Sequence, residues 1–379
     1  MLDTPFFTVD HRNLSDRAAA FIKHEIEPRA ADESDVDRQA REYTAGLARS
    51  GLLKFAVATP GSPLDVRAIC LLREALAYSS PLADLAFVMQ GLGTYAISQA
   101  ASEHVRDFWL ARAVEGKAIA AFALTEPEAG SDVAAIQTTA RLDDDAYIID
   151  GRKRFISNAG IADFYTVFAR TGTRDDGRAE LSAFVVSAKI PGFKVVERTQ
   201  MMAAHPIGEI EFEGCRVPAE DMVGAEGDGF LLAMRTLDTF RSSVGAAACG
   251  MAQRALDEAI RYASSRKQFG RLLAEHQLIQ EKLADMVTEL DAARLLVYHA
   301  AYLKDTGTTR VTREASEAKL FATEAACRII DQAVQIHGGI GLVHGNVVER
   351  LYRDIRALRI YEGTSEIQKL VIASQLLKS

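Results

Sequence analysis

The stretch AIAAFALTEPEAGSD, residues 118–132, is where the pattern of the chain changes. It begins as a short apolar run and stops at a turn that contains Pro127, which is typical of a buried strand followed by a loop. Before it, residues 14–115 alternate apolar and charged positions at helical spacing, with loop signals at 59–63 and 79–84. The sequence therefore predicts helices first and strands next.

Strand patterns continue downstream to about residue 220. Two apolar runs flank Asp150 and Gly151, a pair that favours a two-residue hairpin turn of type I′. The segment EIEFE, residues 209–213, alternates strictly, with apolar side chains on one face and glutamates on the other. We therefore expect a compact antiparallel β domain in the middle of the chain.

Helical periodicity returns after the strands. Apolar residues recur every three or four positions over 244–262 and again over 279–297, which predicts two long amphipathic helices of a bundle. Ser365 and Gln368 fit a capping box, so the last helix is expected to begin at Ser365. The predicted fold class is α+β, with an N-terminal α-helical domain, a middle antiparallel β domain and a C-terminal helical bundle over residues 1–117, 118–225 and 226–379.

The composition is that of an ordinary globular protein, with 379 residues, 48% of them hydrophobic, and a net charge of −8. That charge disfavours a nucleic-acid groove, which needs a basic surface. No apolar run approaches the ~20 residues of a membrane span, and no secretory signal opens the chain. The cysteines lie far apart, so buried thiols in a reducing compartment, and hence a cytoplasmic protein, are expected from Cys70, Cys215, Cys249 and Cys327.

Several common catalytic motifs are missing. The glycine-rich segment 338–346 has His344 where a third nucleotide-binding glycine would stand. His337 and His344 lack the H-E-x-x-H spacing of a zinc site, so no metal is predicted. There is also no Walker motif and no nucleophile elbow. A nicotinamide-dependent enzyme, an ATPase and a zinc hydrolase are therefore unsupported.

Other features can be interpreted in two ways. Phe155 and Ser157 share one face of a predicted strand, where they could meet the face and edge of a planar cofactor or simply belong to the core. The glycine-rich turns at 128–132 and 337–341 could bind phosphate through backbone N–H groups or be only turns. Arg266 begins a basic segment that could contact a pyrophosphate or lie in solvent.

Glu362 is a single acid between Tyr361 and Gly363, just ahead of the last predicted helix. By itself it could be a surface acid, favoured by the helix dipole. It could equally be a functional carboxylate, and the wider sequence supports that interpretation.

Six segments, taken in order, resemble the acyl-CoA dehydrogenase family of flavoenzymes. The resemblance covers almost the whole chain and implies an N-terminal helical domain, a middle β domain and a C-terminal four-helix bundle. The segments are ALTEPEAGSD (123–132), GRKRFISNAG (151–160), GDGF…LDTFR (227–241), RKQFG…HQ (266–277), QIHGGIG (335–341) and YEGTSEIQ (361–368).

The resemblance implies FAD as the cofactor and an acyl-CoA as the substrate. Ser157 would donate near N5 of the flavin, and the adenine end would lie partly across a subunit interface. The implied FAD contacts are Phe122, Leu124, Thr125, Phe155 and Ser157 near the ring, and Arg266, His276, Gln277, Gln335, Gly338, Gly339, Thr364 and Glu366 toward the adenine and phosphates.

Glu362 matches the family's catalytic base, and the N–H of Gly363 would face the thioester carbonyl. Further substrate contacts are implied at Ser131, Asp238 and Arg241. Oxidation at the α and β carbons requires loss of an α proton to a carboxylate whose pKa burial has raised. Charge develops on the thioester oxygen, so a fixed N–H donor is needed there.

Some positions depart from the family pattern. Members often have Tyr and Trp where this chain has Phe122 and Phe155. Some carry the base at the position of Phe240, which cannot act as one, so Glu362 is the matching candidate. The glycine-rich loop usual near 57–66 is missing, and that loop helps to shape the acyl pocket in relatives.

We therefore expect an FAD-dependent dehydrogenase that forms 2-enoyl-CoA, passes electrons to an electron-transfer flavoprotein and assembles as a homotetramer, a dimer of dimers. The alternatives are a flavin oxidase or monooxygenase on the same fold, and a non-catalytic flavoprotein. Straight, branched and cyclic acyl groups stay open, as does an acyl-carrier-protein thioester in place of CoA.

Overall fold

The computed structural model describes residues 4–308 and 310–378. The chain divides into two compact units. The helical unit comprises residues 1–33, 65–84 and 240–379, and the sheet unit comprises residues 34–64 and 85–239.

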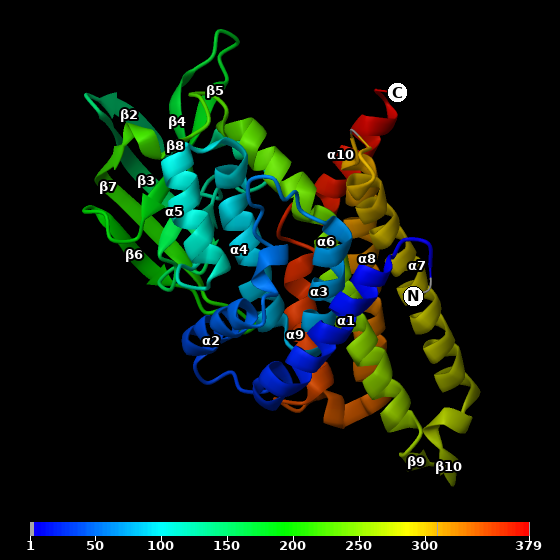
Figure 1. Cartoon of the computed structure of the whole chain (residues 1–379). Coiled ribbons are helices and arrows are strands. Elements are labelled where there is room, and N and C mark those ends of the chain that lie inside the picture. Colours follow the sequence, from blue (N-terminus) through cyan, green and yellow to red (C-terminus); the bar gives the residue numbers. More distant parts are fainter. Residues whose placement is uncertain (1–3, 309, 379) are drawn as a thin grey trace. The chain divides into compact units, whose positions relative to one another are not determined.

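The sheet unit is built on one eight-stranded sheet in the order β6-β7-β3-β2-β4-β5-β8, with β1 added beside β4 (Figure 1). Most neighbours are antiparallel, but β1 pairs with β4 in parallel, and so does β2 through one residue pair. The strands are β1 (Ala120–Ala123), β2 (Thr139–Asp143), β3 (Ala146–Ser157), β4 (Phe164–Thr173), β5 (Ala179–Ser187), β6 (Phe193–Arg198), β7 (Ile207–Pro218) and β8 (Met222–Val223).

Apolar side chains of the sheet pack against helices of the same unit. Phe164, Phe168 and Val185 of β4 and β5 meet Ile97 and Leu110 in one buried cluster. The helices of this unit are α2 (Val36–Arg49), α5 (Glu103–Val114) and the greater part of α4 (Pro81–Ala100), with 3-10 turns at Leu53–Phe55, Val133–Ala135 and Ala219–Asp221.

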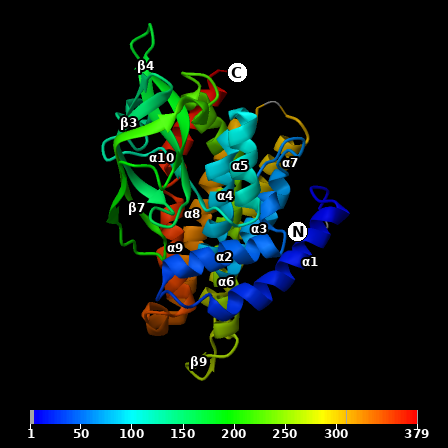
Figure 2. The same ribbon diagram turned by 60° about the vertical axis from the view of Figure 1, so that its left-hand side comes forward.

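The helical unit is a bundle in which α7 and α8 lie side by side (Figures 1 and 2). The small hairpin of β9 and β10 joins α6 to α7. The elements of the helical unit are α1 (Val9–Phe21), α3 (Val66–Ser79), α6 (Gly229–Ala263, which begins in the sheet unit), β9 (Lys267–Gln268), β10 (Arg271–Leu272), α7 (Gln277–Asp305), α8 (Thr312–His337), α9 (Val347–Leu358) and α10 (Ser365–Leu376), with short turns at Ile22–Ile26, Glu27–Arg29, Leu273–Glu275 and Gly338–Leu342.

The predicted apolar stripes form the core of this bundle. Val244 and Met251 of α6 and Met286, Leu290 and Val297 of α7 are all buried in one cluster. The predicted α+β class, with helices before and after a β region, is confirmed.

The predicted hairpin turn at Asp150–Gly151 is wrong. Strand β3 runs straight through both residues, and the turn lies at Asp144, whose φ is 54°. The register between β3 and β7 shifts at Gly151, which makes this point a β-bulge. A Cβ at Gly151 would lie 2.7 Å from Thr138, so glycine is needed there for close packing.

One predicted loop and one predicted helix cap also need correction. The predicted loop at 79–84 is a one-residue break, because α3 ends at Ser79 and α4 begins at Pro81, a position that proline favours. Helix α10 does begin at Ser365, but its N-cap is Thr364, whose Oγ1 accepts from the Ile367 N–H over 3.3 Å. Gln368 therefore has a different role from the predicted capping box.

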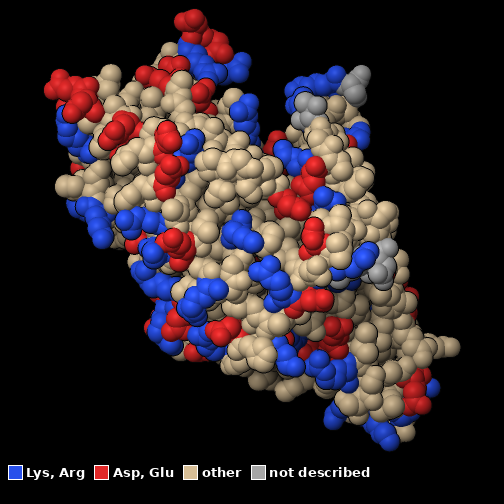
Figure 3. All heavy atoms as spheres, in the orientation of Figure 1, with Lys and Arg blue, Asp and Glu red and all other residues tan. Residues whose placement is uncertain are grey.

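Within the residues that the structure describes, none of the helices has the length and apolarity needed to cross a membrane. On the face drawn in Figure 3, acidic and basic side chains are interspersed.

Candidate active site

The turn between α9 and α10 holds Glu362 in an unusual backbone conformation. Glu362 has a φ of 53° and Gly363 a φ of 90°, so both lie in the left-handed region. Glycine tolerates that region because it lacks a Cβ, whereas a residue with a side chain is held there at a cost of roughly 1–3 kcal/mol. Such strain persists where surrounding contacts fix the backbone, and it is concentrated at functional sites.

Two buried side chains fix this turn. Lys319 Nζ, from α8, donates to the carbonyl oxygen of Gly363 over 2.7 Å. Gln368 Nε2, from α10, donates to the carbonyl oxygens of Glu362 and Gly363 over 3.1 and 3.0 Å. Both side chains belong to fully buried residues. The backbone around Glu362 is therefore held from two helices.

The carboxyl group of Glu362 belongs to a partly buried residue. Its Oε2 is buried and has no hydrogen-bond partner among the described residues. Burial raises the pKa of Glu362 above its ordinary value, and the positive charges of Arg73, Lys319 and Arg241 oppose that rise without cancelling it. Glu362 is therefore not a solvated surface acid, because one of its oxygens is kept dry and close to cations.

Arg73 and Asp84 form a buried ion pair whose charges act on Glu362. Arg73 Nε and Nη2 donate to Asp84 Oδ1 and Oδ2, each over 2.8 Å, and Arg73 Nη1 donates to Ser243 Oγ over 2.9 Å. The two residues are 1% and 3% exposed. Although burial alone would lower it, the Asp84 carboxylate raises the pKa of Arg73, so the guanidinium stays charged. This pair was not predicted from the sequence, because Asp84 was expected to lie in a loop.

Lys319 is the second buried cation near the turn. Burial is the largest effect on its ammonium group and lowers the pKa of Lys319 to about 8, while Glu362 acts in the opposite direction. At neutral pH the ammonium is still largely protonated. Glu362 is thus surrounded by groups that favour its ionised form, within a site whose burial disfavours it.

A pH dependence of stability follows from the raised pKa of Glu362. The folded protein holds the proton of the Glu362 carboxyl group more tightly than the unfolded chain does. Protonation of Glu362 therefore stabilises the fold fully below the ordinary pKa of 4.5, and this contribution is lost as the pH rises through the pKa of the folded protein. Glu362→Gln cannot ionise. We expect its melting temperature to exceed that of the parent by an amount that grows with pH in this window. A difference that is constant from pH 4 to pH 8 would contradict the raised pKa.

The residues expected near the flavin ring lie on two adjacent segments of the sheet unit. The N–H of Arg154 in β3 donates to the carbonyl of Thr125 over 2.9 Å, and Lys153 donates to the carbonyl of Leu124 over 3.1 Å. The end of β1 and the end of β3 are therefore neighbours, which brings together Phe122, Leu124, Thr125, Phe155 and Ser157. Leu124 is buried and the other four are partly or largely exposed.

His205 was not singled out from the sequence. Its Nε2 lies 2.8 Å from the hydroxyl oxygen of Ser157, and burial lowers the pKa of His205 to about 4. A neutral imidazole therefore partners the hydroxyl that was expected to meet the flavin. His205 lies in the irregular connection between β6 and β7, where no periodicity could have identified it.

The residues expected at the adenine end form two groups in the helical unit. One group follows α6 around the β9–β10 hairpin, and the other follows α8. Tyr262 stacks on His337 with a centroid separation of 4.5 Å, so the ends of α6 and α8 meet. His276 is half-buried, and the other members are exposed. These are Arg266, Gln277, Gln335, Gly338 and Gly339.

The remaining predicted residues are more scattered. Thr364 caps α10, and Glu366 is exposed in the first turn of that helix. Asp238 and Arg241 lie on α6, where Arg241 is buried. Ser131 is exposed in the loop after β1.

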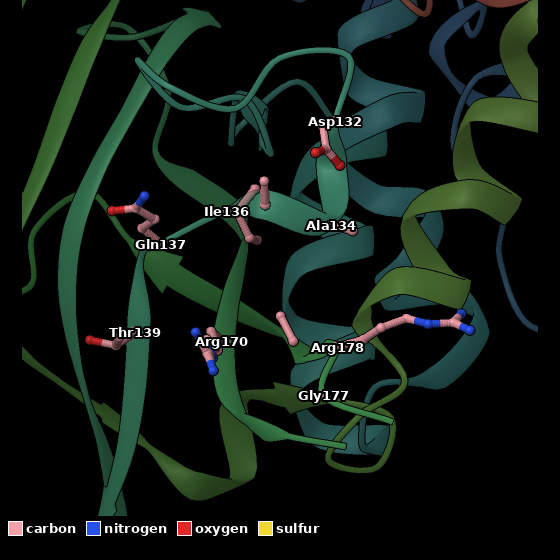
Figure 4. A pocket seen from close by; sticks show the side chains of 10 residues that line it. Asp132, Ala134, Ile136, Gln137, Thr139, Arg170, Gly177 and Arg178 are labelled. Carbon is pink, nitrogen blue, oxygen red and sulfur yellow. The ribbon is translucent and has the colours of Figure 1, made fainter. Parts of the chain in front are cut away.

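The sheet unit also has an open pocket of about 570 Å³. It lies close to Ser131 in sequence but is lined by other residues, among them Asp132, Gln137, Arg170 and Arg178 (Figure 4). None of the site residues predicted from the sequence lines this pocket.

The residues expected near the flavin ring and near the phosphates have surroundings that fit FAD. Phe155 keeps 49% of its surface exposed, so its ring can stack on a planar group. Ser157, at the end of the same strand, offers a partly exposed hydroxyl. A Cβ at Gly338 or Gly339 would meet nothing within 4 Å, so the backbone there is open to close approach by phosphates.

Comparisons with known proteins agree with this arrangement. Family models for the N-terminal, middle and C-terminal domains of acyl-CoA dehydrogenase match residues 8–117, 121–215 and 227–377. The 3-(aryl)acrylate reductase of Clostridium sporogenes is 42% identical over 98% of this chain and 100% of its own length.

Solved structures give the same result. A chain from a structure described as the electron transferring flavoprotein of Acidaminococcus fermentans has a TM-score of 0.90 and 34% identity, covering 98% of this chain and 99% of its own. A glutaryl-CoA dehydrogenase of Mycobacterium smegmatis in complex with FADH2 has a TM-score of 0.89 and 28% identity, covering 100% and 97%. The chain therefore belongs to the acyl-CoA dehydrogenase family, whose members are FAD-dependent oxidoreductases.

Proposed function

We propose that this protein oxidises a saturated acyl-CoA to the 2-enoyl-CoA, with Glu362 as the base. The observation that carries the proposal is the buried, unpartnered Oε2 of Glu362 in a fixed turn among Arg73, Lys319 and Arg241. A carboxylate that is short of hydrogen bonds and has a raised pKa is suited to take a proton.

The chemistry divides between the chain and its cofactor. Glu362 takes the proton from the α carbon, and the C–H electron pair becomes the new double bond. FAD, when bound, accepts the hydride that leaves the β carbon. The Gly363 N–H stabilises the charge that develops on the thioester oxygen. The neighbouring cations favour the ionised form of Glu362, which is the form that accepts the proton.

The cofactor would be held by the residues named above. Phe155 and Phe122 would flank the ring system with Leu124 and Thr125, and Ser157 would donate to its edge. Arg266, His276, Gln277 and the segment Gln335–Gly339 would hold the adenine and pyrophosphate, with Thr364 and Glu366 near the phosphates. Ser131, Asp238 and Arg241 would contact the CoA part of the substrate.

An electron-transfer flavoprotein is the proposed electron acceptor, supported by the similarity to the Acidaminococcus fermentans structure. A homotetramer built as a dimer of dimers is the proposed assembly, supported by the family resemblance. The acyl group is not assigned, although the aryl substrate named for the Clostridium sporogenes relative makes an arylpropionyl-CoA a natural member of a test panel.

The test is an anaerobic titration of the FAD-loaded protein with a panel of acyl-CoAs. The panel contains straight-chain, branched, cyclic and 3-phenylpropionyl thioesters. At least one is expected to bleach the flavin absorbance and to yield one equivalent of 2-enoyl-CoA without oxygen. Product formation only in the presence of oxygen would favour the oxidase, and no bleaching by any member would contradict the proposal.

A further inference from the structure

Gln368 holds the active-site turn through two carbonyl groups. Its Nε2 donates to the carbonyl oxygens of Glu362 and Gly363, over 3.1 and 3.0 Å. Gln368 is completely buried in the first turn of α10. The sequence suggested a helix cap at this position, but Thr364 caps α10, which leaves the Gln368 amide available for the turn.

The contact with the Glu362 carbonyl also sets the direction of an N–H group. The carbonyl of Glu362 and the N–H of Gly363 belong to one planar peptide unit, and the described chain has no cis peptide bond. In a trans unit the carbonyl and the N–H point in opposite directions. With its carbonyl fixed on Gln368, this unit must aim its N–H away from α10.

The Gly363 N–H is available for a ligand. It donates to no group within the described residues. Lys319 fixes the next carbonyl along, that of Gly363, over 2.7 Å. The peptide units on both sides of Gly363 are thus held by side-chain donors, while the N–H between them stays unused.

Close packing makes the arrangement rigid. A Cβ at Gly363 would lie 2.5 Å from Gln368 Nε2, so the amide sits directly against the glycine. Glu362 has a left-handed backbone angle, which a residue with a side chain keeps only where contacts hold it. Loss of the Gln368 amide would remove a donor from the carbonyl groups of Glu362 and Gly363. The peptide unit between these two residues could then rotate.

We infer that Gln368 is a positioning residue that aims the Gly363 N–H at the thioester carbonyl, with Lys319 holding the adjacent peptide unit. The inference rests on the proposed function, which assigns the thioester oxygen to that N–H. Gln368 does not touch the substrate itself. It acts through the backbone, so its effect should appear in the polarisation of the bound carbonyl.

The test measures that polarisation by infrared spectroscopy. The probes are 3-phenylacryloyl-CoA and 2-butenoyl-CoA, each carrying ¹³C at the thioester carbonyl, bound to the FAD-loaded protein. A hydrogen bond to the carbonyl lowers its stretching frequency. In the parent, the frequency of at least one probe is expected to fall on binding. In Gln368→Leu, more than half of that fall is expected to disappear while the FAD content is unchanged.

Kinetics and a matched control separate positioning from general damage. The rate of flavin reduction at saturating acyl-CoA should fall between about tenfold and about a hundredfold in Gln368→Leu, less than the full loss of an oxyanion donor. Gln39→Leu makes the same change at a buried glutamine of α2, where the amide donates to Tyr43. That control should keep both the carbonyl shift and the rate.

Every outcome bears on the inference. It is overturned if Gln368→Leu keeps the full carbonyl shift, or if Gln39→Leu loses as much of it. Should the leucine variant fail to fold, Gln368→Glu keeps the shape but sets a carboxylate against two carbonyls, and it should show the same loss. If the carbonyl frequency of neither probe falls on binding to the parent, the assignment of the Gly363 N–H to the thioester oxygen fails as well. If flavin bleaching in the parent is intact, the proposed reaction survives either failure.

Discussion

Replacing Glu362 by glutamine is expected to slow the anaerobic reduction of bound FAD by acyl-CoA at least about a hundredfold, the lower bound for a general base. The substitution keeps the size of the side chain and removes its ability to take a proton. Stopped-flow absorbance with the best thioester of the panel measures the rate. FAD content should match the parent, because the proposed role of Glu362 sets it against the acyl group rather than the cofactor.

A matched control guards against a general charge effect. Glu317→Gln removes a half-buried carboxylate from α8, where it pairs with Arg313 over 3.7 Å. That variant should reduce its flavin at the parent rate. A Glu362→Gln protein that does the same would show that Glu362 is not the base.

Arg73→Leu is expected to destabilise the fold by about 3–5 kcal/mol, the usual result of breaking a buried ion pair from one side. Asp84 is 3% exposed and receives two hydrogen bonds from Arg73. Without the guanidinium, its carboxylate must stay buried and unpaired, or take up a proton. Urea unfolding at pH 7, read by circular dichroism, measures the loss.

The double variant Arg73→Leu/Asp84→Leu tests the cause. A buried ion pair replaced by apolar residues is often close to neutral in stability, so much of the loss should be recovered. If the single variant is as stable as the parent, or the double variant is less stable than the single, the pair does not have the energetic role assigned here.

The elements that were predicted correctly are those whose signal lies within one segment. The apolar stripes of α6 and α7 repeat at helical spacing because one face of each helix is buried, and Met286, Leu290 and Val297 are in the core. The prediction of a turn at Asp150–Gly151 was wrong because pairing with neighbouring strands decides the conformation of these residues. Gly151 pairs with Phe212 of β7 and Asp150 with Thr139 of β2. The Gly214 N–H also donates to the Asp150 carboxylate over 2.6 Å.

The same distinction applies to the site. Glu362 and Gly363 could be identified because they stand inside a recognisable segment. Arg73 contacts Ser243, which is 170 positions away, and Lys319 contacts Gly363, which is 44 positions away. Residues of this kind look like ordinary helix positions in the sequence. Their roles depend on which helices meet, and only the folded chain provides that information.

The most direct test of the central claim isolates proton transfer from electron transfer. An acyl-CoA with sulfur in place of its β carbon has acidic α protons but no β hydride to give. The FAD-loaded protein, incubated with this thioester in D₂O, should exchange the α protons for deuterium, as followed by mass spectrometry. Glu362→Gln, loaded with the same amount of FAD, should leave them unexchanged. Equal exchange by both proteins would contradict the assignment of Glu362 as the base.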